Sequence, residues 1–191
     1  PIAGMGGRVG LKGTDGVSKS AIALGAKPVA PVKAVEFLER LKALEMVATI
    51  DLITCPSVMG GDEVKSACLK AQILPMSLKS ETTADDTKTA VRHMVALNVD
   101  LIVFVGGDGT ARDILDAMRG STILPVLGVP SGVKMYSGVF AASSRDAADV
   151  VQAVVEKSAQ TIDFEVMDVD EEAVRTDRLS VSLYGFLKGP F

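Results

Sequence analysis

Residues 100–112 read DLIVFVGGDGTAR, and this stretch decides the fold. The apolar run Leu101–Val105 is typical of a strand that is covered on both faces of a sheet. It continues through Gly106 and Gly107 into Ala111–Leu115, which has the composition of the first turns of a helix. Backbone N–H groups and the helix dipole favour anions at such a turn. The stretch therefore predicts a phosphate-binding turn between a buried strand and a helix.

Asp108 lies in the middle of this turn, where its negative charge opposes phosphate. A carboxylate suits this place as a metal ligand, or as a base that takes a proton from a hydroxyl attacking the phosphate. The alternative is an aspartate that only caps the following helix. Gly107 and Gly109 on either side favour close approach of a ligand. Asp108 is therefore our candidate catalytic residue, and the choice between base and metal ligand stays open.

The composition excludes several classes of protein. Of the 191 residues, 48% are apolar and the formal net charge is −4, with lysine and arginine scattered along the chain. This pattern argues against a nucleic-acid surface or a basic membrane patch. No apolar run approaches the roughly 18 residues of a membrane span. Cys55 and Cys68 form neither a disulfide framework nor a metal-binding spacing. We expect a cytoplasmic protein with reduced thiols.

Residues 1–19 are rich in glycine and predict a loop. Gly4, Gly6 and Gly7 almost form a dinucleotide-binding fingerprint, but Val9 stands where its last glycine belongs. A P-loop spacing further along also fails, because Ser18 replaces the second glycine. Two interpretations remain, a surface loop or a loop that folds over a nucleotide with its amides near phosphates.

Helical and strand patterns alternate up to residue 160. We expect helices over Pro31–Met46, Asp62–Lys70, Thr83–Leu97, Ala111–Met118 and Ser143–Lys157, and strands over Val47–Thr54, Gln72–Leu78, Leu101–Val105 and Ile123–Val129. Asp62 is the expected cap of its helix, and Thr83 with Asp86 forms a capping box. The alternation predicts an α/β domain with a parallel sheet.

A second polar loop, Pro130–Gly138, follows the strand that ends at Val129. Ligands of open α/β sheets bind beyond the carboxyl ends of the strands, so both loops are expected to meet at one crevice. Ser131, Gly132 and Lys134 are candidate nucleotide-binding residues. Lys134 and Arg112 could each stabilise charge on a transferred phosphoryl group, and each could equally be an exposed surface residue.

The pattern changes at Thr161. Residues 161–169 alternate as in a strand, and Arg178–Leu187 is again strand-like. We therefore predict one domain over residues 1–160 and the start of an incomplete β-rich domain over residues 161–191. Asp163 and Asp168 could contribute to a Mg²⁺ or ribose site, or lie in an exposed acidic turn. The chain resembles a fragment whose first strand precedes Pro1.

Gly106-Gly107-Asp108-Gly109-Thr110 after an apolar strand resembles the signature of NAD kinases. Diacylglycerol kinase-like, sphingosine kinase-like and phosphofructokinase enzymes share that signature. The stretches Pro1–Gly16 and Gly128–Met135 narrow the resemblance to the predicted ATP-NAD kinases, in the branch that includes acetoin-catabolism protein X. The match extends over residues 1–160.

This resemblance implies a two-domain kinase, with a Rossmann-like, three-layer N-terminal domain and a β-sandwich-like second domain. ATP or inorganic polyphosphate would donate a phosphoryl group to the 2′-hydroxyl of NAD, with Mg²⁺. Asp108 matches the residue that activates the hydroxyl, and the residues that approach the nucleotide would be Gly4, Gly6, Gly7, Gly106, Gly107, Gly109, Thr110, Arg112, Ser131, Gly132 and Lys134. The resemblance also implies a homo-oligomer.

The chain departs from typical NAD kinases in one respect. They carry an Asn-Glu pair soon after the signature, whereas the only asparagine here is Asn98, upstream of it. Two further hypotheses therefore stay open. One is another kinase with this signature that acts on a lipid or a small metabolite. The other is a non-catalytic regulatory protein that binds a nucleotide.

Overall fold

The computed structural model describes residues 1–4, 18–79, 81–120, 124–132, 134–169 and 180–191. It is a mixed α/β structure with parallel strand pairs followed by an antiparallel pair. The helices are α1 (Ser18–Ala23), α2 (Ala30–Ala43), α3 (Gly61–Ser66), α4 (Ala84–Ala96), α5 (Asp108–Met118) and α6 (Ser144–Val155). The strands are β1 (Ile53–Thr54), β2 (Gln72–Ile73), β3 (Ile102–Gly106), β4 (Val126–Pro130), β5 (Thr161–Val169) and β6 (Val181–Pro190).

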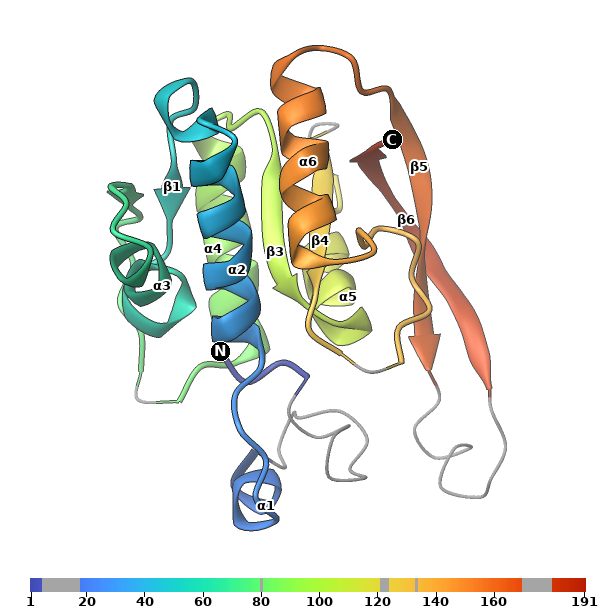
Figure 1. Ribbon diagram of the computed structural model, residues 1–191. Helices are drawn as coiled ribbons and strands as arrows, with labels where there is room; N and C mark the ends of the chain where they lie inside the picture. The colour runs from blue at the N-terminus through green and yellow to red at the C-terminus, as the bar shows by residue number, and fades with distance from the viewer. Residues whose placement is uncertain (5–17, 80, 121–123, 133, 170–179) are drawn as a thin grey trace.

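Strands β3 and β4 form the centre of the molecule. They pair in parallel, from Ile102 opposite Val126 to Gly106 opposite Pro130. Helices α2 and α6 cover one face of this pair, and α4 and α5 cover the other (Figure 1). Side chains on both faces of β3 are covered by helices, and this explains why residues 101–105 are apolar without interruption.

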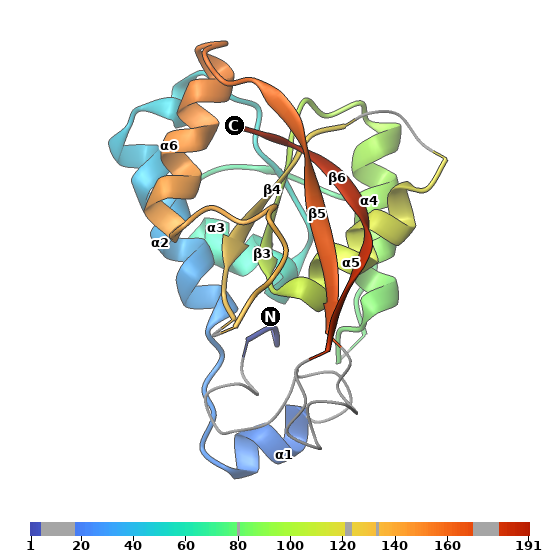
Figure 2. The ribbon, with the colours of Figure 1, turned by 90° about the vertical axis from the view of Figure 1, so that its right-hand side faces the viewer.

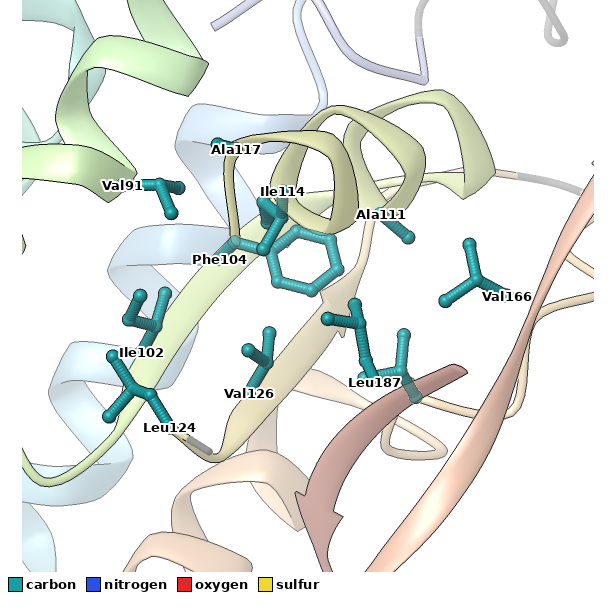
Figure 3. Close-up of a cluster of buried hydrophobic side chains, with 11 residues drawn as sticks. Val91, Ile102, Phe104, Ala111, Ile114, Ala117, Leu124, Val126, Val166 and Leu187 are labelled. Atoms are coloured by element: carbon teal, nitrogen blue, oxygen red, sulfur yellow. The ribbon is translucent and has the colours of Figure 1, made fainter. Parts of the chain in front are cut away.

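The core between β3–β4, α4 and α5 contains Ile102 and Phe104 of β3 and Val126 of β4 (Figure 3). Phe104 points from β3 towards Ile114 of α5, which is only 1% exposed. The ring of Phe104 also meets that of Phe140 edge-on, with centroids 5.3 Å apart. A second core on the opposite face joins α2, α3 and α6 to β4.

The antiparallel pair β5–β6 packs on α5 and β4 (Figure 2). Its Val166 and Leu187 are buried in the same core as Phe104. Gly138 donates its N–H to the carbonyl of Glu165, which attaches the loop after β4 to the edge of β5. The predicted strand over residues 161–169 is confirmed, and the predicted domain boundary at residue 160 stays a prediction.

Three predicted elements are corrected. The predicted strand over Gln72–Leu78 is reduced to Gln72–Ile73. Residues 46–48 form a short 3₁₀ helix after Glu45, which has a left-handed φ of 58°, so the predicted strand over Val47–Thr54 is reduced to Ile53–Thr54. Asp62 does not cap its helix, because α3 begins one residue earlier with Gly60 at the N-cap. The capping box of Thr83 and Asp86 is confirmed, with the Thr83 N–H donating to Asp86 Oδ2 at 2.8 Å.

In the described part of the chain, no helix has both the length and the apolar character that a membrane crossing requires.

The two cysteines are expected to differ in reactivity towards iodoacetamide. Cys55 is buried and Cys68 is exposed. Burial raises the pKa of the Cys55 thiol to about 11, since the thiolate would lose its hydration. A rise of about two pH units lowers the thiolate fraction by roughly 100-fold near neutral pH. Mass spectrometry of the native protein at pH 8 should therefore find Cys68 alkylated first. Alkylation of both at equal rates would contradict the buried position of Cys55.

Candidate functional site

The phosphate-binding turn predicted from the sequence joins β3 to α5. Gly106 ends the strand, Gly107 is the N-cap, and Asp108 is the first residue of the helix. The N–H of Ala111 donates to the carbonyl of Gly107 at 3.1 Å, which is the first bond of the helical ladder. No side chain caps this end. The N–H groups before Ala111 therefore point out of the helix without helical acceptors, in the arrangement that binds anions.

The first glycine of the turn is required by packing. A Cβ atom on Gly106 would lie 2.5 Å from Thr110 Oγ1, so the strand end can approach the first turn of α5 only with glycine there. A Cβ atom on Gly107 would meet nothing within 4 Å. Gly107 therefore faces open space beside the start of the helix, which is where a ligand could approach.

The loop after β4 meets this turn through the carboxylate of Asp108. Tyr136 donates its N–H to Asp108 Oδ2, and Ser137 donates its N–H to Asp108 Oδ1, both at 2.9 Å. The N–H of Ser131 also donates to the carbonyl of Gly106 at 3.0 Å. The expectation that the two loops come together at the carboxyl ends of β3 and β4 is thus confirmed.

The carboxylate of Asp108 is held in place by the loop after β4 and keeps further lone pairs. Each of its oxygens has two lone pairs and accepts one N–H from the loop. The remaining lone pairs leave room for a hydroxyl group of a substrate. Bonds from N–H groups to an ionised carboxylate are stronger than neutral ones, so they fix the orientation of this side chain.

Ser137 connects this loop to β5. Its side chain is buried, and its Oγ accepts the N–H of Met167 at 2.9 Å. The same residue therefore touches Asp108 with its backbone and β5 with its hydroxyl. The antiparallel pair is in this way linked to the turn that contains Asp108.

The N-terminal residues reach the same crevice. Gly4 has a left-handed φ of +81°, and a Cβ atom on it would lie 2.0 Å from the carbonyl oxygen of Ser131. The hydroxyl of Ser131 is buried, and no partner for it is present among the described residues. Gly6 and Gly7 lie outside the described residues.

The two cations predicted near a phosphate have different surroundings. Arg112 forms an ion pair with Asp168, and its guanidinium lies 6.0 Å from the centre of the Tyr184 ring. Arg112 therefore joins α5 to β5 and β6, and its side chain remains one-third exposed. Lys134 is an exposed residue of the loop after β4. Asp163 pairs with Lys188 at 3.0 Å on the antiparallel pair.

A family model for the ATP-NAD kinase N-terminal domain matches residues 31–159. The chain belongs to the ATP-NAD kinase family. Membership in this family indicates a kinase-like phosphotransferase, which agrees with the strand–turn–helix at Gly106–Asp108. No curated protein and no solved structure matches the chain.

The sequence did not predict that Tyr136 and Ser137 contact Asp108. Both act on Asp108 through backbone N–H groups, which every residue except proline possesses. Their side chains therefore carry no signal of the contact. The sequence indicated that the loop after β4 belongs to the site because this polar, glycine-bearing loop directly follows a predicted strand.

Proposed function

We propose that the chain is the nucleotide-binding part of an enzyme that transfers a phosphoryl group from ATP or polyphosphate to the 2′-hydroxyl of NAD. Residues 1–160 would be its Rossmann-like domain, and β5–β6 the start of its β-sandwich. The single observation that carries the proposal is the meeting of a carboxylate with an uncapped helix N-terminus at Asp108. Phosphoryl transfer depends mainly on such positioning of phosphates and of an attacking hydroxyl.

The roles follow from the geometry of this turn. The free N–H groups at the start of α5 would receive the donor phosphates, with the buried Ser131 hydroxyl as a further polar group nearby. Asp108 would accept the proton of the attacking hydroxyl on a lone pair that the loop leaves open. Arg112 and Lys134 stay candidates for contacts with the donor.

Mg²⁺ would fit this site as an ion that arrives with the nucleotide. The described residues contain no group of three or more His, Cys, Asp or Glu side chains that could hold a metal. Mg²⁺ commonly takes one or two carboxylates together with substrate phosphates and water. Asp108 is the carboxylate available for this at the turn. The ion, when bound, would neutralise charge on the phosphates.

The direct test is a kinase assay on the protein with ATP and with polyphosphate, against NAD, NADH and a panel of lipid and small-metabolite acceptors. Formation of NADP supports the proposal as stated. If only another acceptor is phosphorylated, NAD is not the substrate, but the protein is still a phosphotransferase. Nucleotide binding without any product would favour a regulatory protein.

A matched pair of alanine variants tests the anion site itself. Gly106→Ala is expected to lower the free energy of unfolding by about 1–3 kcal/mol, because its Cβ would collide with Thr110. Gly107→Ala should lower it by only about 1 kcal/mol or less, since space there is open. Its methyl group would, however, stand where phosphate approaches, so the ATP dissociation constant should rise roughly tenfold or more.

Denaturant unfolding and calorimetric titration measure the two effects separately. Unchanged ATP affinity in a well-folded Gly107→Ala protein would show that the start of α5 is not the phosphate site.

A further inference from the structure

The loop after β4 lies between α5 and β5 (Figure 1). Glu165 of β5 accepts the N–H of Gly138, and Met167 of β5 donates its N–H to Ser137 Oγ, both at 2.9 Å. The backbone groups of alternate residues point to the same side of a strand, so one edge of β5 faces this loop. The hydroxyl of Ser137 accepts there in the place of a carbonyl from a neighbouring strand.

Ser137 also holds the carboxylate of the candidate base. Its own N–H donates to Asp108 Oδ1 at 2.9 Å, while its side chain is bound to Met167. The residue is only 7% exposed, so water competes little for its hydroxyl. The backbone of Ser137 therefore cannot move away from β5 without breaking the bond to Met167. Through this residue, the position of the Asp108 carboxylate depends on β5.

A second contact joins α5 to β5. Arg112 lies four residues after Asp108 and hence on the same face of α5. It forms an ion pair with Asp168, the residue that follows Met167 in β5. Both side chains of the pair are about one-third exposed, so the pair contributes little to stability. Its direction is defined all the same, because the guanidinium lies 6.0 Å from the centre of the Tyr184 ring.

Together these contacts form a closed ring. It runs from α5 to the loop after β4, from the loop to β5, and from β5 back to α5, through Asp108, Ser137, Met167, Asp168 and Arg112. The chain supplies the remaining links, since Met167 and Asp168 are consecutive, and Asp108 and Arg112 are about one helical turn apart. No member of a closed ring can be displaced alone. The ring therefore restricts the carboxylate of Asp108 more than either contact would by itself.

The loop is attached to β4 by separate bonds. Gly128 of β4 donates its N–H to the carbonyl of Val139, and Ala141 donates its N–H to the carbonyl of Gly128, both at 2.9 Å. Neither bond includes a member of the ring. The hydroxyl of Ser137 is therefore not needed to attach the loop to β4, and its contact with β5 orients the part of the loop that reaches Asp108.

We propose that Ser137 and Asp168 are positioning residues, through which β5 holds the Asp108 carboxylate in the orientation that receives the proton of the attacking hydroxyl. Ser137 acts from the loop, and Asp168 acts through Arg112. This inference rests on the proposed function, in which Asp108 is the base. It adds that the antiparallel pair orients this base, although no residue of β5 needs to touch the substrate.

Hydrogen exchange at single amides tests the positioning without any turnover. The amide of Tyr136 is the probe, because it donates to Asp108 Oδ2. In Ser137→Ala its exchange is expected to become faster by roughly fivefold or more, since the loop is no longer tied to β5. The Gly128 and Ala141 amides, which attach the loop to β4, should keep their rates.

Ser158→Ala is the matched control, because it also loses one hydroxyl hydrogen bond, to the carbonyl of Ala153 and outside the ring. It should leave the exchange of Tyr136 unchanged. An unchanged rate in Ser137→Ala would overturn the proposal. Equal acceleration at Tyr136 and at the amide of Gly128 would overturn it too, because the hydroxyl would then serve the folding of the whole loop. These rates can be measured even if the wild-type chain forms no NADP, so a failure of the proposed function is distinguished from a failure of this inference.

The kinase assay gives the second readout. Ser137→Ala and Asp168→Asn are each expected to lower the turnover number on the order of 10- to 100-fold, as misplacement of a catalytic group does, with KM for the nucleotide unchanged. The double variant should lose little more than the worse single variant, because members of one ring act as a unit. An unchanged turnover number in either single variant, or a rise in KM alone, would overturn the proposal and leave the phosphotransferase activity established. A loss in the double variant equal to the product of the two single losses would overturn the ring.

Discussion

Replacing Asp108 with asparagine is expected to lower phosphoryl transfer by about 10²- to 10⁴-fold, the range that a general base supplies. Asparagine has nearly the same shape, but it cannot take a proton from a hydroxyl. Its amide nitrogen would also face one of the two N–H groups that Tyr136 and Ser137 now direct at the carboxylate. The variant would therefore remove the proposed base and weaken the contact that holds the loop.

The stability of this variant separates folding from chemistry. The variant loses one charge-assisted hydrogen bond, and its amide NH₂ group faces an N–H group of the loop, so that two donors meet. The free energy of unfolding should therefore fall by about 1–3 kcal/mol, and the protein still folds. The turnover number and KM for the acceptor are measured on protein shown to be folded by denaturant titration. Asp149→Asn is the control, since its exposed pair with Arg40 contributes at most about 1 kcal/mol.

The pattern of the kinetic changes identifies the role of Asp108. A fall in turnover number with KM unchanged supports the base. A rise in KM for the nucleotide with turnover number retained would indicate that Asp108 only positions the loop after β4. Wild-type turnover would remove Asp108 from the mechanism.

The elements that the sequence predicts well are those whose pattern is local. The alternation over Thr161–Val169 gives the bounds of β5 without error, and the apolar run before Gly106 gives β3 within one residue. Val47–Thr54 has a similar apolar composition and still forms only a two-residue strand. A strand exists where a neighbour supplies hydrogen bonds, and β2 pairs with Ile53 and Thr54 alone, through bonds from the N–H groups of Gln72 and Leu74 to the carbonyls of Leu52 and Thr54. The residues of Val47–Thr54 do not by themselves show how far a neighbouring strand will pair with them.

In the candidate site, too, the local features could be predicted and the contacts between distant residues could not. Gly106–Thr110 could be predicted because a strand, a glycine turn and a helix start are consecutive in the chain. The partners of Asp108 are 28 and 29 residues away and act through backbone N–H groups, which leave no trace in the residue types. Arg112 was expected near phosphate, and its ion pair with Asp168 joins residues 56 positions apart. That contact depends on how β5 packs on α5.

Replacing Phe104 with alanine is expected to lower the free energy of unfolding by about 3–5 kcal/mol. The ring is only 8% exposed and lies between β3 and α5, where it meets Ile114 and the ring of Phe140. Alanine would leave a cavity that β3 cannot close, since its backbone is fixed by its pairing with β4. Typical domains are stable by about 5–15 kcal/mol, so this loss is a large fraction of the total.

Urea denaturation followed by far-UV circular dichroism measures this loss as a shift of the midpoint at an unchanged slope. Val32→Ala is the matched control, because Val32 of α2 is 57% exposed and its truncation should change stability by no more than about 0.5 kcal/mol. A Phe104→Ala protein within that same margin of the wild type would mean that the ring is not part of a close-packed core. The strand that carries it would then be positioned by its hydrogen bonds to β4 alone, and the Gly106–Asp108 turn would not depend on the packing of α5 against β3.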